Sequence, residues 1–225
     1  MSKNQEGYLG LQRGKLGPGV GFVLDGKQIY RAYVDTISNP RTDPQVYYRT
    51  RFAKLGVVAK TFNDAASIGF DNVRKPMNNG YNTFMSRNMS AVSGETVGEL
   101  QVEYAQLQVS DGALPAPTFG TLRLEEALTV EVPFTSNSDI VGADAKDQVY
   151  VFVYQPDTNG GVLAPAVQRS AGRVSVAVPG SWSGMKVHVY GFARATMNKT
   201  NDLGRTVTHT GDCSQTAYIG SGTIV

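Results

Sequence analysis

The chain has 225 residues, 41% of them hydrophobic, and a formal net charge of +2. These values fit one large or two small globular domains and exclude a strong electrostatic preference of the whole molecule for its partners. A single cysteine, Cys213, excludes an internal disulfide. No signal region or membrane-length apolar segment is visible, so we expect the chain to be made and kept in the cytoplasm, or packaged into something assembled there.

The charge is unevenly distributed along the chain. Residues 1–60 contain ten Lys or Arg and four Asp or Glu, whereas residues 61–225 contain eleven and fifteen. This asymmetry is typical either of solvated charges on a helix or of a basic face that binds an acidic partner. In the second case the partner is either another acidic molecule or residues 61–225 of a neighbouring copy.

The N-terminal segment is expected to form an arm followed by a β-hairpin. Residues 1–19 are polar and glycine-rich, which predicts a flexible arm. Residues 20–34 have strand-forming residues on both sides of Asp25-Gly26. This dipeptide favours a type I′ hairpin turn because both positions adopt positive φ readily.

Residues 42–62 are expected to form the principal α-helix. Thr42 and Gln45 match a capping box at its start. Apolar residues then recur every three or four positions, which predicts one helical face buried on a sheet, with the basic residues outside it. If that face is buried, Phe52→Ala is expected to cost about 3–5 kcal/mol of folding free energy. The predicted stripe comprises Tyr48, Phe52, Leu55, Ala59 and Phe62.

From residue 99 onward, short alternating strands are separated by turn residues. About seven strands without intervening helices predict an antiparallel β-sandwich with immunoglobulin-like topology. The expected class is therefore mainly β, with one principal helix and a short helix in 81–89. The expected organisation is a flexible arm (1–19), a hairpin–helix module (20–98) and the sandwich (99–225). Strands are expected at 100–109, 121–134, 148–155, 173–178, 186–196 and 215–223.

No arrangement of residues specifies a metal site or a cofactor, and we predict neither. His188 and His209 lack partners at metal-ligand spacing, and His188 is expected to face solvent or to pack. Three aspartates, Asp139, Asp144 and Asp147, crowd one loop and leave a calcium site open as an alternative, although their spacing does not match an EF-hand.

Catalytic motifs are also missing from the sequence, so we expect no enzyme. His209 precedes Cys213 by four residues, but an incidental or buried thiol explains this pair better than a nucleophile. Gly14 and Gly17 surround Lys15 as in a phosphate-binding loop. The strand before and the helix after such a loop are not predicted here.

Nucleic-acid binding has more support than catalysis. Basic residues of the N-terminal third are interleaved with tyrosines, which is typical of surfaces that bind single strands. In this interpretation the basic helix 42–62 contacts the nucleic acid. The candidate interaction residues are Lys15, Lys27, Arg31, Arg41, Arg49, Arg51 and Lys54.

A resemblance adds to these inferences. The segments GKLGPGVGFVLDGKQIYRAY, NPRTDPQVYYRTRFAKL and IGF resemble a family of Bacteroidota proteins that carry a domain of unknown function. They are also similar to small hypothetical proteins of tailed phages and prophages. The resemblance covers about the first third of the chain and transfers no catalytic residue. The matching positions are Gly14, Lys15, Gly17, Gly21, Gly26, Arg31, Asn39, Pro40, Arg41, Thr42, Gln45, Arg49, Phe52, Ile68, Gly69 and Phe70.

The phage context of this resemblance implies a particle component. We therefore predict a non-enzymatic structural or assembly protein, namely a phage virion or tail-related subunit that self-associates through its N-terminal third. Its expected partners are further copies or other virion proteins. The alternative is a nucleic-acid-binding accessory protein that uses the basic helix.

Overall fold

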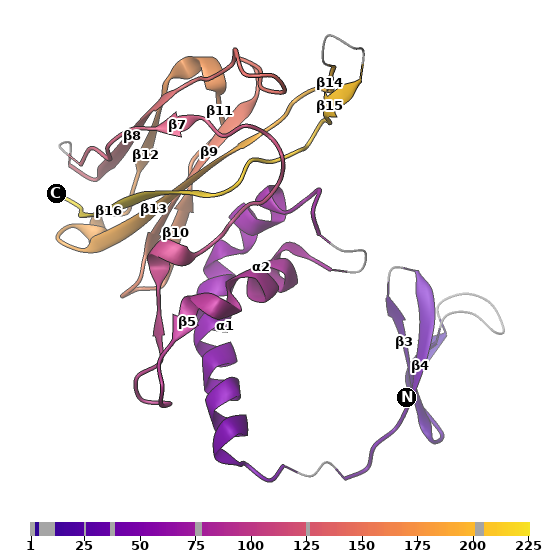
Figure 1. Cartoon of the computed structure of the whole chain (residues 1–225). Helices are drawn as coiled ribbons and strands as arrows, with labels where there is room; N and C mark the ends of the chain where they lie inside the picture. The colour runs from indigo at the N-terminus through magenta and orange to yellow at the C-terminus, as the bar shows by residue number, and fades with distance from the viewer. Residues whose placement is uncertain are drawn as a thin grey trace. The chain divides into compact units, whose positions relative to one another are not determined.

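The structure is a computed structural model in which the chain divides into two compact units, Met1–Asp43 and Pro44–Val225 (Figure 1). The hairpin and the principal helix, which were expected in one module, therefore belong to different units. Within the described part of the chain, no helix is long and apolar enough to cross a membrane. The described residues are 3–4, 12–24, 26–36, 39–74, 78–124, 127–200 and 205–225.

The first unit is a four-stranded antiparallel sheet with the order β1-β2-β3-β4. The expected hairpin is formed by β3 and β4, in which Leu24 pairs with Lys27. Gly26 has a φ of 73°, and Asp25 lies outside the described residues. Part of the expected arm is a strand, β2, while residues 5–11 lie outside the description. The strands are β1 (Lys3–Asn4), β2 (Gln12–Leu16), β3 (Gly19–Leu24) and β4 (Lys27–Ala32).

The second unit begins with the principal helix, α1 (Asp43–Gly69). It extends beyond the expected end at residue 62 because its apolar face continues through the buried residues Ala65 and Ala66. The predicted capping box is wrong, since Gln45 Oε1 is buried without a hydrogen-bond partner. A second helix, α2 (Gly80–Asn88), corresponds to the short helix expected in 81–89.

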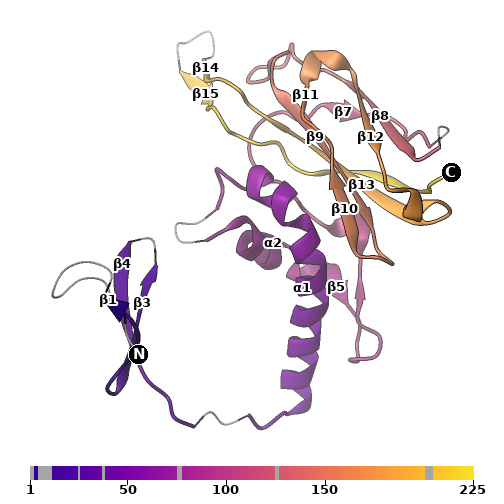
Figure 2. The same ribbon diagram turned by 180° about the vertical axis from the view of Figure 1, so that it is seen from behind.

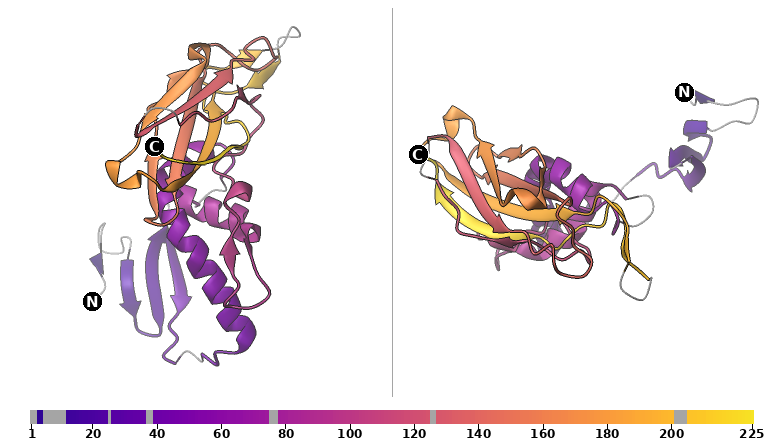
Figure 3. Two further views of the ribbon diagram at one scale, coloured as in Figure 1. Left: turned by 90° about the vertical axis from the view of Figure 1, so that its left-hand side faces the viewer. Right: turned by 90° about the horizontal axis from the view of Figure 1, so that it is seen from above.

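The predicted apolar stripe of α1 is buried only in its C-terminal part. Leu55 and Phe62 are fully buried, whereas Tyr48 is 63% exposed and Phe52 is 52% exposed. The prediction that Phe52 belongs to the core is therefore wrong. The first turns of α1 lie beside the hairpin formed by β5 (Val92–Ser93) and β6 (Gln101–Val102) (Figure 3). Among the residues of these turns, Tyr47 packs against the main core and its hydroxyl donates to Gly94 O at 2.7 Å.

The five-stranded sheet of this unit is covered on both faces. Alternate valines of β9, namely Val149, Val151 and Val153, belong to the core shared with the three-stranded sheet. The aromatic residues between them belong to the core shared with α1 and α2 (Figure 2). Helices, the five-stranded sheet and the three-stranded sheet therefore form three layers. The predicted antiparallel, mainly β class is confirmed, and the immunoglobulin-like topology stays a prediction.

The two main sheets have the orders β10-β9-β13-β16, with β11 also on β9, and β12-β8-β7. The expected strand at 100–109 is mostly irregular, because Tyr104–Gln106 forms a 3-10 turn. The bounds are β7 (Thr118–Phe119), β8 (Thr129–Thr135), β9 (Gln148–Gln155), β10 (Gly160–Leu163), β11 (Val167–Gln168), β12 (Arg173–Ala177), β13 (Lys186–Arg194), β14 (Lys199–Thr200), β15 (Thr206–Thr208) and β16 (Ala217–Thr223).

Two alanine substitutions on α1 test the position of its buried face. Phe62→Ala is expected to lower the free energy of unfolding by about 3–5 kcal/mol, because Phe62 is fully buried. The Phe62 ring centroid lies 4.6 Å from that of Phe152. Phe52→Ala, the matched control on the same helix, is expected to cost less than about 1 kcal/mol because half of Phe52 is exposed. Urea unfolding measures both, and equal losses would show that the buried face is misassigned.

Candidate interaction site

The register of the N-terminal sheet gathers cations and apolar residues on one face. Directly paired residues of an antiparallel sheet project from the same face. Val20 pairs with both Lys15 and Arg31, and Phe22 pairs with Ile29. Lys15 also lies over the ring of Tyr33, with Nζ 3.7 Å from the ring centroid. We call this the basic face; it comprises Arg13, Lys15, Lys27, Arg31, Val20, Phe22, Leu24, Ile29 and Tyr33.

The first unit does not bury the basic face. Gly21 is the one buried residue among those described in this unit. Phe22 is 37% exposed, and Tyr33 is 41% exposed. No strand residue in the described part of the sheet is acidic, so the sheet does not neutralise its own cations. Exposed apolar side chains on a sheet one layer thick indicate a contact surface.

The opposite face is lined by glycines and bridged by glutamines. Gly14 pairs with Gly21, and a Cβ atom at Gly21 would lie 3.1 Å from both Gln12 O and Gln28 Nε2. Gln28 Nε2 donates a hydrogen bond to Gln12 O at 2.8 Å. The absence of a side chain at Gly21 leaves room for this bridge across the strands. This glycine therefore has a structural explanation that needs no phosphate.

The structure places three of the seven predicted interaction residues on the basic face: Lys15, Lys27 and Arg31. Sequence reasoning missed Arg13, because residues 12–16 were expected to belong to an arm. The sequence contained a pattern that would have identified it, because Arg13 and Lys15 are two positions apart and such residues share one face of a strand.

The remaining four predicted residues are outside the strands of this sheet. Arg41 precedes α1 with a left-handed φ of 52°, and Arg49 is exposed on α1. The other two, Arg51 and Lys54, have structural contacts. Arg51 Nη2 donates to the carbonyl of Met89, and Lys54 Nζ donates to the carbonyl of Leu100. These two cations fasten the β5–β6 hairpin to α1.

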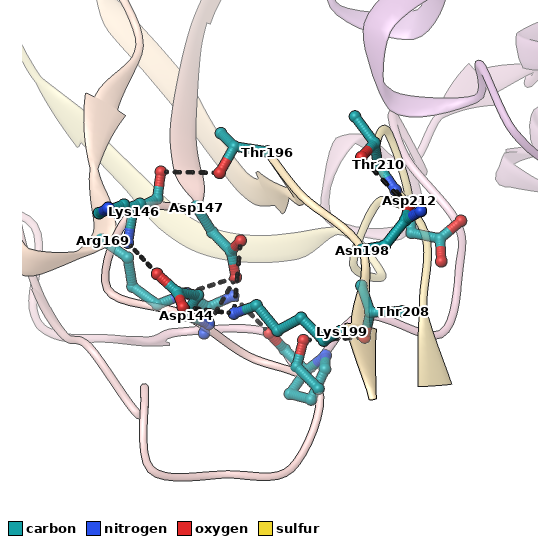
Figure 4. Close-up of polar contacts among 12 residues, drawn as sticks. Asp144, Lys146, Asp147, Arg169, Thr196, Asn198, Lys199, Thr208, Thr210 and Asp212 are labelled. Carbon is teal, nitrogen blue, oxygen red and sulfur yellow. Dashed lines mark hydrogen bonds and ion pairs between the residues drawn. The ribbon is translucent and has the colours of Figure 1, made fainter. Parts of the chain in front are cut away.

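A second group of charges is buried inside the second unit (Figure 4). Asp147 and Arg169 are fully buried, with Arg169 Nε 3.6 Å from Asp147 Oδ2. Arg169 also donates to Pro115 O at 2.7 Å and to Ser136 O at 3.0 Å. Burial raises the pKa of Asp147, and the nearby guanidinium opposes that effect. Arg169 thus ties two loops to β9.

Two of the three aspartates that left a calcium site open, Asp144 and Asp147, lie beside protein cations. Lys199 Nζ lies 3.0 Å from Asp144 Oδ2 and 4.0 Å from Asp147 Oδ1, while Asp139 is exposed (Figure 4). Across the described ranges, no three His, Cys, Asp or Glu residues are grouped so as to hold a metal ion. The cluster attaches the β14–β15 hairpin to this loop and has a structural role.

Cys213 is buried and does not form the thiol–imidazole pair considered from the sequence. Its Sγ lies 3.3 Å from Ile68 O, to which it donates, and burial raises its pKa to about 12. His209 is exposed. A thiol that remains protonated at neutral pH is a poor nucleophile.

His188 packs in the interior, which is one of the two environments expected for it. It is 8% exposed, and its Nδ1 lies 2.9 Å from the hydroxyl oxygen of Tyr218. The ring of Tyr104 lies against it, with centroids 4.7 Å apart. Burial, with a smaller contribution from the charge of Lys186, lowers the pKa of His188 to about 4. The imidazole is therefore neutral at physiological pH.

A family model described as a family of unknown function, DUF6266, matches residues 11–203. No curated protein and no solved structure matches the chain. The match includes residues of both compact units. It assigns no activity, ligand or partner.

His188 predicts a pH dependence of folding stability. Because its pKa falls to about 4 in the folded state, folding favours the neutral ring, and this contribution is present above the unfolded pKa. Stability is therefore expected to fall by up to about 3 kcal/mol as the pH drops from about 6.5 to about 4. Urea unfolding at several pH values measures the slope. His188→Gln should flatten it, whereas the exposed control His209→Gln should not; an unchanged slope in His188→Gln contradicts this assignment.

Proposed function

The chain belongs to the DUF6266 family, whose function is unknown, and from its geometry we propose that it is a non-enzymatic structural or assembly protein. In this proposal the second unit is a folded scaffold. The N-terminal sheet is the element through which the chain self-associates or binds other subunits. The observation that carries the proposal is the exposed basic face of a sheet that has no core of its own.

The two units differ in how they bury apolar residues. The second unit has two hydrophobic cores, whereas Phe22, Leu24 and Tyr33 of the first unit remain 37–41% exposed. A sheet needs a packed face to be stable, so a partner that covers these side chains would stabilise it. Burial of apolar surface, which drives the folding of the scaffold, would therefore also drive association.

The interior of the scaffold supports a non-enzymatic role. His188 bonds to Tyr218, and the thiol of Cys213 keeps its proton. Arg169 donates hydrogen bonds to the backbone carbonyls of Ser136 and Pro115. These groups contribute to packing. A place in a phage virion or tail is the finer form of the proposal, and it is supported by the resemblance of the N-terminal segment alone.

Self-association through the basic face is testable by light scattering coupled to size exclusion over a range of concentrations. The wild-type chain is expected to form concentration-dependent oligomers. Replacing two apolar residues of the face, in the double variant Phe22→Ser with Ile29→Ser, is expected to weaken them about tenfold or more. Tyr30→Ser, on the opposite face, is the control and should leave them intact. A wild-type chain that stays monomeric at every concentration contradicts the proposal.

Nucleic-acid binding is a second candidate, favoured by a specific observation. The basic face combines several cations with the rings of Phe22 and Tyr33, and bases stack on aromatic side chains of such sheets. The element that supports this function is the sheet. The helix 42–62 is less suitable because Arg51 and Lys54 are engaged with carbonyls.

This second candidate predicts salt-dependent binding of a fluorescein-labelled oligothymidylate, measured by anisotropy. Each phosphate neutralised should contribute about −0.7 to the slope of log affinity against log salt. Lys15→Gln with Lys27→Gln and Arg31→Gln should reduce both affinity and slope. Arg173→Gln, on β12, is the control. Absent or salt-insensitive binding removes the candidate.

A further inference from the structure

A lysine of the β14–β15 hairpin reaches the buried Asp147–Arg169 pair (Figure 4). Lys199 Nζ is itself buried, and it lies 3.0 Å from Asp144 Oδ2 and 4.0 Å from Asp147 Oδ1. Both aspartates lie directly before or at the start of β9, far from Lys199 in the sequence. An amine and two carboxyl groups from distant segments therefore meet in a site that excludes solvent.

Three atoms of this cluster are buried and have no hydrogen bond to any residue that the structure describes: Lys199 Nζ, Asp147 Oδ1 and Arg169 Nε. Buried polar atoms without hydrogen bonds cost folding free energy, so they call for an explanation. The other oxygen of Asp147 is held in place. Oδ2 accepts a hydrogen bond from Asp144 N at 2.8 Å and lies 3.6 Å from Arg169 Nε. The two carboxyl oxygens of Asp147 thus have different environments.

Burial favours the neutral forms of the amine and of the carboxyl group. It raises the pKa of Asp147, against the opposing effect of Arg169, and it lowers the pKa of Lys199. Proton transfer from the ammonium to the carboxylate gives an amine, which is the nucleophilic form of lysine, beside a carboxylic acid. Proximity favours their reaction, because well-oriented groups within one molecule reach effective concentrations of about 10⁵–10⁸ M.

We infer that Lys199 and Asp147 condense to form an intramolecular isopeptide bond between Nζ and Cγ. The amine and the unpaired carboxyl oxygen that this bond requires are the two atoms 4.0 Å apart. The inference goes beyond the proposed function and does not depend on it. Each chain reacts once, with itself, so the reaction is compatible with a non-enzymatic protein.

The condensation needs no oxidant and no second substrate. Asp144, at 3.0 Å from Nζ, passes two protons in succession from Lys199 to Asp147 Oδ1. The amine attacks Cγ, and negative charge develops on Oδ2, which faces the backbone N–H of Asp144 and the guanidinium of Arg169. Oδ1 then leaves as water. One C–N bond forms and one C–O bond breaks, so an ammonium and a carboxylate become an amide and a water molecule.

The hairpin is positioned for this reaction by contacts that do not involve the reacting groups. Lys199 pairs with Thr208 across β14 and β15, and the buried Thr208 donates from its hydroxyl to Gly142 O at 2.9 Å. After condensation, Arg169 and Asp144 remain as charges of opposite sign, so the cluster stays neutral. The bond would also restrict the unfolded chain by closing a long loop, as a disulfide does.

Mass spectrometry of the full chain tests this inference. After prolonged incubation at neutral pH and denaturation, the wild-type chain is expected to be lighter than its sequence mass by one water molecule. Tandem spectra of a tryptic digest should show Lys199 joined to the peptide that contains Asp147, with the bond at Asp147. Asp144→Asn, which removes the proton relay, is expected to slow the loss of water about a hundredfold or more. A loss at the wild-type rate overturns the role of Asp144.

Two lysine variants identify the source of the lost water. Lys199→Arg retains the positive charge without the amine and should keep its full sequence mass. Lys146→Arg, at the exposed lysine beside Asp147 in the sequence, is the matched control and should still lose water. A loss of water that persists in Lys199→Arg would come from a succinimide at an aspartate, and it overturns the inference. A wild-type chain at its full sequence mass, or a bond between other residues, overturns it as well.

Discussion

Burial of both faces of β9 and β13 is the constraint on which the second unit depends. A strand with apolar side chains on both sides needs a layer against each, and here the layers are the three-stranded sheet and the two helices. Phe62 completes the helical layer by contacting aromatic rings from both strands. The environment of His188 lies at the edge of this layer, because Tyr104 packs both against the helical core and against the His188 ring.

The first unit follows the opposite principle. Its strands pair with one another, but large side chains remain in water, and the proposed association would stabilise the sheet by covering them. The cations on its face would restrict which surfaces can take part in that association. In the proposed association, the apolar residues would provide the attraction and the cations would select the partner.

Charged groups inside the second unit have a different role from those on its surface. Arg169 and Asp147 are removed from water, and each replaces lost hydration with a protein partner. Lys199 connects this pair to the β14–β15 hairpin. A buried pair of this kind does little for net stability but strongly disfavours alternative loop positions, because separating the charges leaves one of them unpaired. The cluster thus orders the loops at one end of the sandwich.

Local sequence patterns were sufficient to predict β9, the hairpin around Asp25-Gly26 and the existence of the principal helix. Strand alternation, turn conformation and helical spacing depend only on neighbouring residues. Periodicity could not predict where the helical stripe is buried. Phe52 and Phe62 occupy the same stripe, yet only Phe62 has a sheet opposite it. Strand register likewise decided which cations share a face with Arg13. Burial and register are relations between distant segments, so the tertiary structure alone determines them.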